Sequence, residues 1–266
     1  MKYFSIFILL IGFFTAKTSY AALVDGLVTY YSFDGNANDL SGNGNDGVVY
    51  GATLTTDRFG VANRAYDFDG INDYILASAD PLPTADRTVA LWFKADSLIN
   101  NPMLMGYGGG TCGTSWYMGL NASNDGSYHL SSHCNANTLT SAYSQPPINK
   151  WIHFAASTDA NGTRLYVNGV EVASNNNYIT NTSVLGRDLS IGVATSPSGF
   201  APYTDINIGF FDGALDDVRV YNRALSLSEI QQLAAVPLAP AVYYFGIGIL
   251  FLIGAIRKTP IIKTNN

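Results

Sequence analysis

Residues 31–47, with the sequence YSFDGNANDLSGNGNDG, concentrate oxygen-bearing side chains in a short stretch. Three aspartates, four asparagines and four glycines occur there: Asp34, Asp39, Asp46, Asn36, Asn38, Asn43, Asn45, Gly35, Gly42, Gly44 and Gly47. Carboxylate and carboxamide oxygens suit Ca²⁺, and glycines allow a loop to fold closely around an ion. No glutamate closes the loop as in an EF-hand, and the same residue types also form solvated turns. The stretch therefore predicts either a calcium-binding loop or a turn cluster.

A pair of adjacent carboxylates, Asp216 and Asp217, lies near the other end of the chain in a strand-like run, GALDDVRVYNR. Neighbouring carboxylates in a strand repel each other unless a cation or hydrogen bonds hold them. We therefore predict calcium as a cofactor, bound by Asp34, Asp39, Asn45 and Asp216 together with backbone carbonyls. The acidic turn 69–73 is a candidate for a second ion, although Asp-Gly turns also form without metal.

Aromatic and small residues gather between residues 103 and 134. We predict that Tyr107, Trp116 and Tyr128 bind a ligand, because aromatic rings stack on the apolar faces of sugars. The alternative is that these rings belong to the core. The only two cysteines, Cys112 and Cys134, are predicted to form a disulfide if the chain is exported, with two buried thiols as the alternative.

Catalytic motifs are scarce in this sequence. Retaining glycosidases need two carboxyl groups about 5–5.5 Å apart, and the only glutamates are Glu171, beside a turn, and Glu229, in a helix cap. Asp216 and Asp217 are the remaining candidate pair, but strand alternation predicts that they point to opposite faces. We therefore predict a non-catalytic protein, with a glycan hydrolase as the less favoured alternative.

Short runs of alternating or continuous apolar residues predict about a dozen strands. Residues 87–94, RTVALWFK, predict an inner strand with Val89, Leu91 and Phe93 on one face. Asn168-Gly169 predicts a type I′ hairpin turn. Ser226 and Glu229 form a capping box that predicts a helix over 226–233. The pattern is that of an all-β chain with one short C-terminal helix.

Composition limits the partners of this chain. Residues 22–235 contain nine basic and twenty acidic residues, a net charge of −11, which excludes a nucleic-acid role that needs a basic face. Residues 1–21 resemble a secretory signal, with Lys2 followed by an apolar run and small residues before a cut ahead of Ala22. We therefore predict an exported protein whose single domain spans residues 22–235.

The C-terminal segment, 236–266, contains a second targeting signal. It combines VPLAP, the apolar run 242–256 and the basic pair Arg257 and Lys258. This order resembles the bacterial PEP-CTERM sorting tail, which implies processing by a sorting transpeptidase. A plain membrane anchor is the alternative, although fifteen apolar residues are short for a spanning helix. Both alternatives place the folded domain outside the cytoplasm, at the cell surface, in the outer envelope or in the extracellular matrix.

Four ordered motifs cover nearly all of the mature chain: YYSFDGNANDLSGNGNDG, YDFDGINDYI, WIHFAASTDANGTRLYVNG and GALDDVRVYNRALSLSEI. Together they resemble laminin-G-like domains of the concanavalin A-like superfamily. The resemblance implies an antiparallel β-sandwich of the jelly-roll type, often with structural calcium and often binding carbohydrate or protein. We predict a calcium-stabilised module that binds a polysaccharide or a matrix glycan. The alternative is a structural or adhesive envelope or biofilm protein that binds protein partners.

Overall fold

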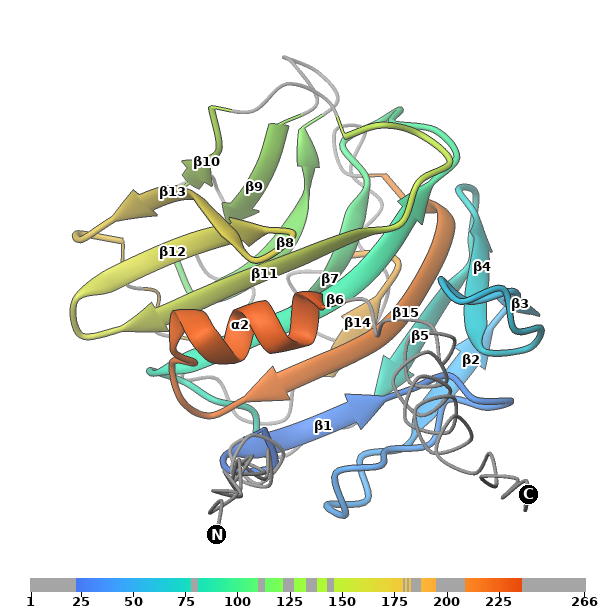
Figure 1. Cartoon of the computed structure of the whole chain (residues 1–266), viewed down its shortest axis with the longest axis horizontal. Coiled ribbons are helices and arrows are strands. Elements are labelled where there is room, and N and C mark those ends of the chain that lie inside the picture. The colour runs from blue at the N-terminus through green and yellow to red at the C-terminus, as the bar shows by residue number, and fades with distance from the viewer. Residues whose placement is uncertain are drawn as a thin grey trace, which may run out of the picture. The chain divides into compact units, whose positions relative to one another are not determined.

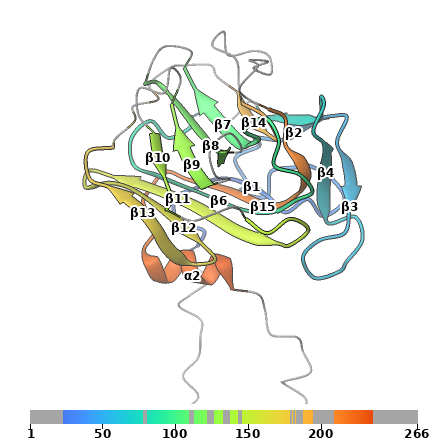
Figure 2. The same ribbon diagram turned by 90° about the horizontal axis from the view of Figure 1, so that it is seen from above.

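The computed structural model describes residues 23–77, 81–109, 113–121, 127–132, 138–142, 146–178, 180, 182, 188–194 and 209–235. These residues form a sandwich of two antiparallel sheets, with one helix, α2 (Leu227–Ala234), against the outside of one sheet (Figures 1 and 2). The predicted all-β sandwich with a short C-terminal helix is confirmed.

The described residues form fifteen strands, which are divided between the two sheets. The first sheet has the order β13 (Val170–Asn175), β12 (Gly162–Val167), β11 (Ile152–Asp159), β6 (Arg87–Ala95), β15 (Asp212–Tyr221), β4 (Ala65–Asp69) and β3 (Thr53–Thr55), while β1 (Leu27–Tyr31) also pairs with β15. The second sheet has the order β10 (Thr138–Thr140), β9 (Ser127–Ser131), β8 (Ser115–Asn121), β7 (Met103–Gly108), β14 (Leu189–Ile191), β5 (Tyr74–Ala77) and β2 (Gly47–Tyr50).

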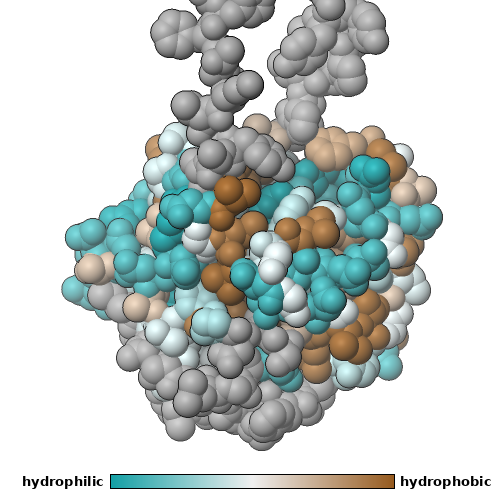
Figure 3. Space-filling model, turned by 90° about the horizontal axis from the view of Figure 1, so that it is seen from below, coloured by the Kyte–Doolittle hydropathy of each residue, from teal (hydrophilic) through white to brown (hydrophobic). Residues whose placement is uncertain are grey.

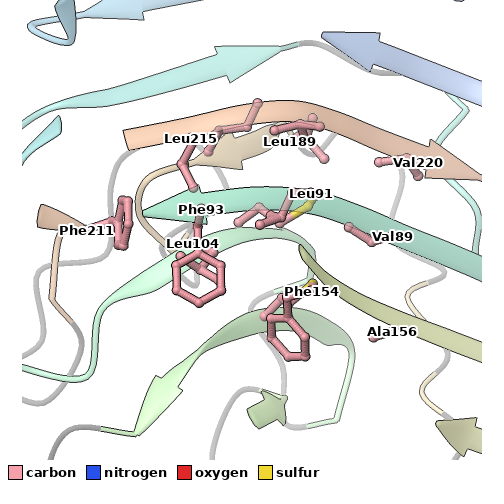
Figure 4. Close-up of a cluster of buried hydrophobic side chains, with 14 of the residues drawn as sticks. Val89, Leu91, Phe93, Leu104, Phe154, Ala156, Leu189, Phe211, Leu215 and Val220 are labelled. Carbon is pink, nitrogen blue, oxygen red and sulfur yellow. The ribbon is translucent and has the colours of Figure 1, made fainter. Parts of the chain in front are cut away.

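The core lies between the sheets, because alternate residues of each strand point inward. In β6 the predicted inner face, Val89, Leu91 and Phe93, is buried in this core (Figure 4). Figure 4 also shows Phe154 from the neighbouring strand β11 and Leu104 from β7 of the opposite sheet within the same cluster. The central strand β6 therefore contributes its whole inner face to the contact between the sheets.

The predicted hairpin and helix both form. Asn168 and Gly169 connect β12 to β13 with φ values of 49° and 77°, as a type I′ turn requires. At the start of α2 the Ser226 amide donates to Glu229 Oε2 at 2.8 Å, and the Glu229 amide donates to Ser226 Oγ at 3.4 Å, which is the predicted capping box. The apolar side of α2 then covers the outer face of the first sheet, where Ile230 packs with residues of β6, β11 and β12.

Strand β15 is the longest strand among the residues that the structure describes, and it pairs along both of its edges. One edge pairs with β6, whereas the other pairs first with β4, over residues 212–215, and then with β1, over 218–221. The register shifts between Asp216 and Arg219, and Asp217 adopts φ 53°, so a β-bulge lies where the partner changes from β4 to β1. The extra residue in the bulge directs both carboxylates to the outer face of the sheet. The prediction that strand alternation separates Asp216 from Asp217 is therefore wrong.

Arg58, in the connection between β3 and β4, neutralises this acidic pair. Its Nη1 binds Asp216 and its Nη2 binds Asp217, while the guanidinium lies 5.1 Å from the centre of the Trp92 ring. Arg219 Nη2 also donates to Asp217 Oδ1 at 3.0 Å. Burial raises the pKa of Asp216 to about 7, the charge of Asp217 raises it too, and Arg58 acts in the opposite direction. Arg58 is therefore the group that favours the charged form of Asp216 against its burial.

Replacing Arg58 by methionine should destabilise the fold strongly. The change keeps much of the side-chain volume but leaves two buried carboxylates without their main counter-charge, which costs about 3–5 kcal/mol. The matched control is Arg64→Met, whose partner Asp34 is 51% exposed, and there we expect a loss of about 0–1 kcal/mol. Urea unfolding of both variants measures the difference, and equal losses would contradict this role of Arg58.

Replacing Glu229 by glutamine should make the free energy of unfolding less dependent on pH. Hydrogen bonds from Arg223, at 2.6 and 3.1 Å, and from the helix cap lower the pKa of Glu229 to about 2. Because this pKa is lowered on folding, its contribution is present above pH 4.5 and is lost as the pH falls toward 2. We expect Glu229→Gln to cost about 1 kcal/mol at pH 7. Urea midpoints should converge with those of the wild type near pH 2–3, whereas a constant gap would count against this assignment.

Candidate functional site

The loop predicted to bind calcium is organised by Asp39. Its carboxylate accepts the amides of Tyr30 at 2.9 Å, Ser41 at 2.9 Å and Asn45 at 3.1 Å, and the Ser41 hydroxyl at 2.7 Å. Asn45 is buried, and its side-chain amide donates to the carbonyl of Val28 at 3.1 Å. These contacts are those of a turn cluster, in which the side chains satisfy backbone groups of the loop and of β1.

The other predicted ligands have separate partners. Asp34 forms an exposed ion pair with Arg64 at 3.3 Å, and Asp216 is bound by Arg58. Within the described ranges, no three histidine, cysteine, aspartate or glutamate side chains are grouped so as to hold a metal ion. The arrangement does not fit one ion shared by Asp34, Asp39 and Asp216. The calcium site stays a prediction that these contacts do not support.

The three rings predicted to bind a ligand lie in the core. Tyr107, Trp116 and Tyr128 are 1%, 0% and 3% exposed and belong to the cluster between the sheets. They occupy inward positions of β7, β8 and β9, so in this structure none of them offers a ring face at the surface. A binding surface must therefore use other rings. Cys112 and Cys134 lie outside the described residues, so their predicted disulfide stays a prediction.

The outer faces of the two sheets differ. On the first sheet, α2 and the segment that carries Arg58 cover outer positions of β6 and β11. Trp92 of β6 is one of these covered residues, and its Nε1 donates to the carbonyl of Leu233 at 3.3 Å. On the second sheet, no helix of the described chain covers the outer face (Figure 2). Seen from below, hydrophilic residues predominate among the coloured residues, and the apolar ones gather in a few patches (Figure 3). The side chains of β7, β9 and β14 in the second sheet are buried on both faces, so the accessible part of its outer face is the β2 edge, where alternate side chains are exposed.

Three aromatic rings, Tyr50, Tyr74 and Phe210, form a row on this outer face, which we call the aromatic ladder. Tyr50 in β2 lies directly opposite Tyr74 in β5, and their rings stack at 4.6 Å with an angle of 16° between the planes. Phe210 lies 6.5 Å from Tyr74 with an angle of 37°. Tyr50 is 43% exposed, and β2 is the last strand of its sheet. The outer end of the ladder therefore has no neighbouring strand.

The opposite half of the same face carries polar groups that are buried. Tyr117 and His129, on the outward positions of β8 and β9, are 2% and 6% exposed. Burial lowers the pKa of His129 to about 4, so its ring is neutral at pH 7. Its Nδ1 has no hydrogen-bond partner within the described part of the chain. The exposed apolar surface thus lies at the β2 edge rather than over β8 and β9.

Tyr50 and Tyr74 were not selected as site residues from the sequence. Each belongs to a strand of four residues, and in β2 both Val48 and Tyr50 are exposed at alternate positions. The sequence of β2, Gly-Val-Val-Tyr, has no apolar–polar alternation that would reveal which side chains face outward. The sequence could not show that β2 pairs with β5, because β3 and β4 of the other sheet and the turn 69–73 separate the two strands along the chain.

The predicted signal, 1–21, and the C-terminal segment, 236–266, lie outside the described residues. Among the residues that the structure describes, no helix is long and apolar enough to cross a membrane. Processing by a transpeptidase and anchoring in a membrane stay predictions of the sequence.

Several solved structures share this fold at low sequence identity. Domain 4 of AbnA, an extracellular GH43 arabinanase from Geobacillus stearothermophilus solved with arabinotriose, matches with a TM-score of 0.63 and 23% identity, covering 79% of this chain and 98% of that one. The ligand-binding domain of botulinum neurotoxin serotype D, solved with N-acetylneuraminic acid, matches at TM-score 0.57 and 15% identity, covering 79% and 51%. The binding domain of Paraclostridial Mosquitocidal Protein 1 matches at 0.58 and 16%, covering 80% and 52%.

The chain spans about half the length of the two toxin domains and nearly all of the arabinanase domain. Among curated proteins, none has a sequence significantly similar to this chain. A laminin-G-type family model, described as the concanavalin A-like lectin/glucanases superfamily, matches residues 69–231. This match spans more than half of the sequence and agrees with the two-sheet sandwich. The chain therefore belongs to the concanavalin A-like lectin/glucanase superfamily.

Proposed function

We propose that this chain is a non-catalytic glycan-binding module that binds saccharide at the aromatic ladder. The observation that carries the proposal is the exposed end of the ladder, where Tyr50 stacks on Tyr74 at the edge of the second sheet. The saccharides in the solved relatives, arabinotriose and N-acetylneuraminic acid, support glycan as the ligand class.

The ladder suits a sugar because of its spacing. The Tyr50 and Tyr74 rings are 4.6 Å apart, close to the distance between neighbouring strands, so the rings stand side by side on the sheet. A sugar ring on the side of Tyr50 that faces away from Tyr74 would extend the stack. The apolar C–H face of the sugar would then lie against the Tyr50 ring. Stacking of this kind needs no movement of the backbone, and rigid aromatic side chains lose little conformational entropy on binding.

Hydrolysis is the less favoured alternative. Asp216 and Asp217, the only carboxylate pair that the sequence suggested, are 2% and 7% exposed and are bound by Arg58. A substrate would have to displace Arg58 to reach them. An adhesive or structural envelope protein that binds protein partners is the second candidate, favoured by the exposed apolar residues outside the ladder, such as Phe59 and Ile99.

The proposal places the module outside the cytoplasm, exported by residues 1–21 and attached or sorted through residues 236–266. Calcium is not required by the ladder, because its three members are aromatic. If an ion binds the 31–47 loop, it would act on stability and not on stacking.

Replacing Tyr50 by alanine should weaken glycan binding by at least about tenfold, equivalent to about 1.4 kcal/mol. The change removes the exposed ring, and its cost in stability should stay within about 1 kcal/mol, because only a cross-strand pair is lost. The measurement is a glycan array with the wild type, followed by calorimetric titration of the best ligand with wild type and variant. Tyr50→Phe should retain binding, because it preserves the ring.

The matched control for this experiment is Phe59→Ala. Phe59 is 45% exposed and Tyr50 is 43% exposed, so the two rings are similarly accessible. Phe59 stacks on Arg58 and is not part of the ladder. We expect this variant to bind glycan like the wild type, with calcium and with chelator. Glycan binding that survives Tyr50→Ala would refute the ladder as the site. A wild type that binds no glycan on the array would refute the proposed function and favour protein partners.

A further inference from the structure

The turn that joins β11 to β12 carries an acceptor tripeptide for N-linked glycosylation, Asn161-Gly162-Thr163. The sequence contains two further tripeptides of this type, at 121–123 and 181–183. Of the three, only 161–163 lies wholly within the residues that the structure describes. Such a tripeptide receives a glycan in an exported protein at a surface position, so the place of the asparagine in the fold decides whether it can be modified.

Asn161 is exposed at the tip of the β11–β12 hairpin. Its backbone amide donates to Asp159 Oδ1 at 2.7 Å, which closes the turn, and its Nδ2 donates to Asp159 Oδ2 at 3.4 Å. Nδ2 is the atom to which a glycan would be attached. The acceptor nitrogen therefore belongs to an exposed side chain beside a carboxylate, and the core does not depend on it.

A glycan on this hairpin would leave the aromatic ladder free. The ladder lies on β2 and β5, at one end of the strand order of the second sheet, and β10 lies at the other end. β13, the neighbour of β12, contacts β10. The β11–β12 hairpin and the ladder thus lie on opposite sides of the sandwich, and modification of one does not block the other.

The hydroxyl of Thr163, by contrast, is enclosed in the folded protein. Thr163 is 1% exposed, and its Oγ1 donates to the carbonyl of Tyr178 at 2.7 Å and lies 2.9 Å from Oγ1 of Thr158. This hydroxyl is part of the acceptor motif that a transferase recognises. Recognition therefore has to precede the closure of the hairpin, because afterwards it would require local unfolding of β12.

We propose that Asn161 is an N-glycosylation site that is modified during export, before the β11–β12 hairpin closes. The donor is an oligosaccharide linked to a lipid diphosphate. A bond forms between Nδ2 of Asn161 and C1 of the first sugar as the C1–O bond to the diphosphate breaks. The electron pair of the broken bond leaves with the diphosphate, and Nδ2 gives up one proton to a base of the transferase. The proposal depends on export through residues 1–21 and not on the ladder.

The experiment exports the full chain from bacteria that supply an oligosaccharyltransferase and its lipid-linked donor. Mass spectrometry measures the glycan on the tryptic peptide 151–164, which contains Asn161. We expect the wild type and Thr163→Ser to carry the glycan, and Asn161→Gln and Thr163→Val to lose it. Asn168 is the internal control, because it is exposed in the next hairpin but is followed by Gly169 and Val170, with no hydroxyl residue. It should stay unmodified.

A second measurement tests the order of events. Unmodified full chain, purified in its folded form, is incubated with the same transferase and donor. We expect at least about tenfold lower occupancy of Asn161 than in the exported protein, because only the locally opened fraction can react. Equal occupancy in the two samples would overturn transfer before hairpin closure.

The remaining outcomes also decide the proposal. An exported wild type without glycan on Asn161, in cells that modify a known acceptor protein, would overturn it, and so would a full chain that is not exported. A glycan that persists in Thr163→Val would show that the tripeptide is not what is recognised. If Thr163→Val is degraded, loss in Asn161→Gln and retention in Thr163→Ser still decide. None of these results bears on glycan binding at the ladder, which the titration of Tyr50→Ala tests separately.

Discussion

The guanidinium of Arg58 lies between two carboxylates that would otherwise repel each other inside a buried strand. Asp216 and Asp217 point to the same side because the bulge in β15 inserts one extra residue there. At this point the edge of β15 changes its partner from β4 to β1, while the other edge stays paired with β6. The ion pairs therefore join the β3–β4 connection to β15 at the point where the partner of β15 changes from β4 to β1.

This arrangement also covers part of the first sheet. Arg58 packs over Trp92, and α2 covers the neighbouring outer positions of β6 and β11. In the second sheet the side chains of β7, β9 and β14 are buried, whereas alternate side chains of the edge strand β2 are exposed. This edge carries the aromatic ladder. Rings held by a rigid scaffold are a common basis for ligand recognition, because binding then costs little rearrangement.

The local structure was predictable where short-range chemistry decides it. The turn at Asn168-Gly169, the cap formed by Ser226 and Glu229 and the inner face of β6 each depend on residues close in sequence. The fold class was predictable from the four ordered motifs. The accessible site was not, because it depends on which distant strands become neighbours and on which rings turn inward.

Two predictions show the limit most clearly. Trp116 is of a residue type that stacks on sugars, but its side chain in β8 points into the core. Asp216 has the chemistry of a calcium ligand, but Arg58, which is more than 150 residues away in the chain, binds it instead. A pattern of residue types indicates what a side chain can bind, and only the tertiary structure decides which partner it meets.

Hydroxyl-radical footprinting of the full chain, with and without a bound neutral oligosaccharide, tests the central claim most directly. Tyr50 and Phe59 have nearly equal exposures, 43% and 45%, so they should oxidise at comparable rates in the free protein. Our account predicts that the saccharide protects Tyr50 and leaves Phe59 unchanged. Protection of Phe59 with Tyr50 still fully reactive would contradict it and would place the binding surface on the first sheet.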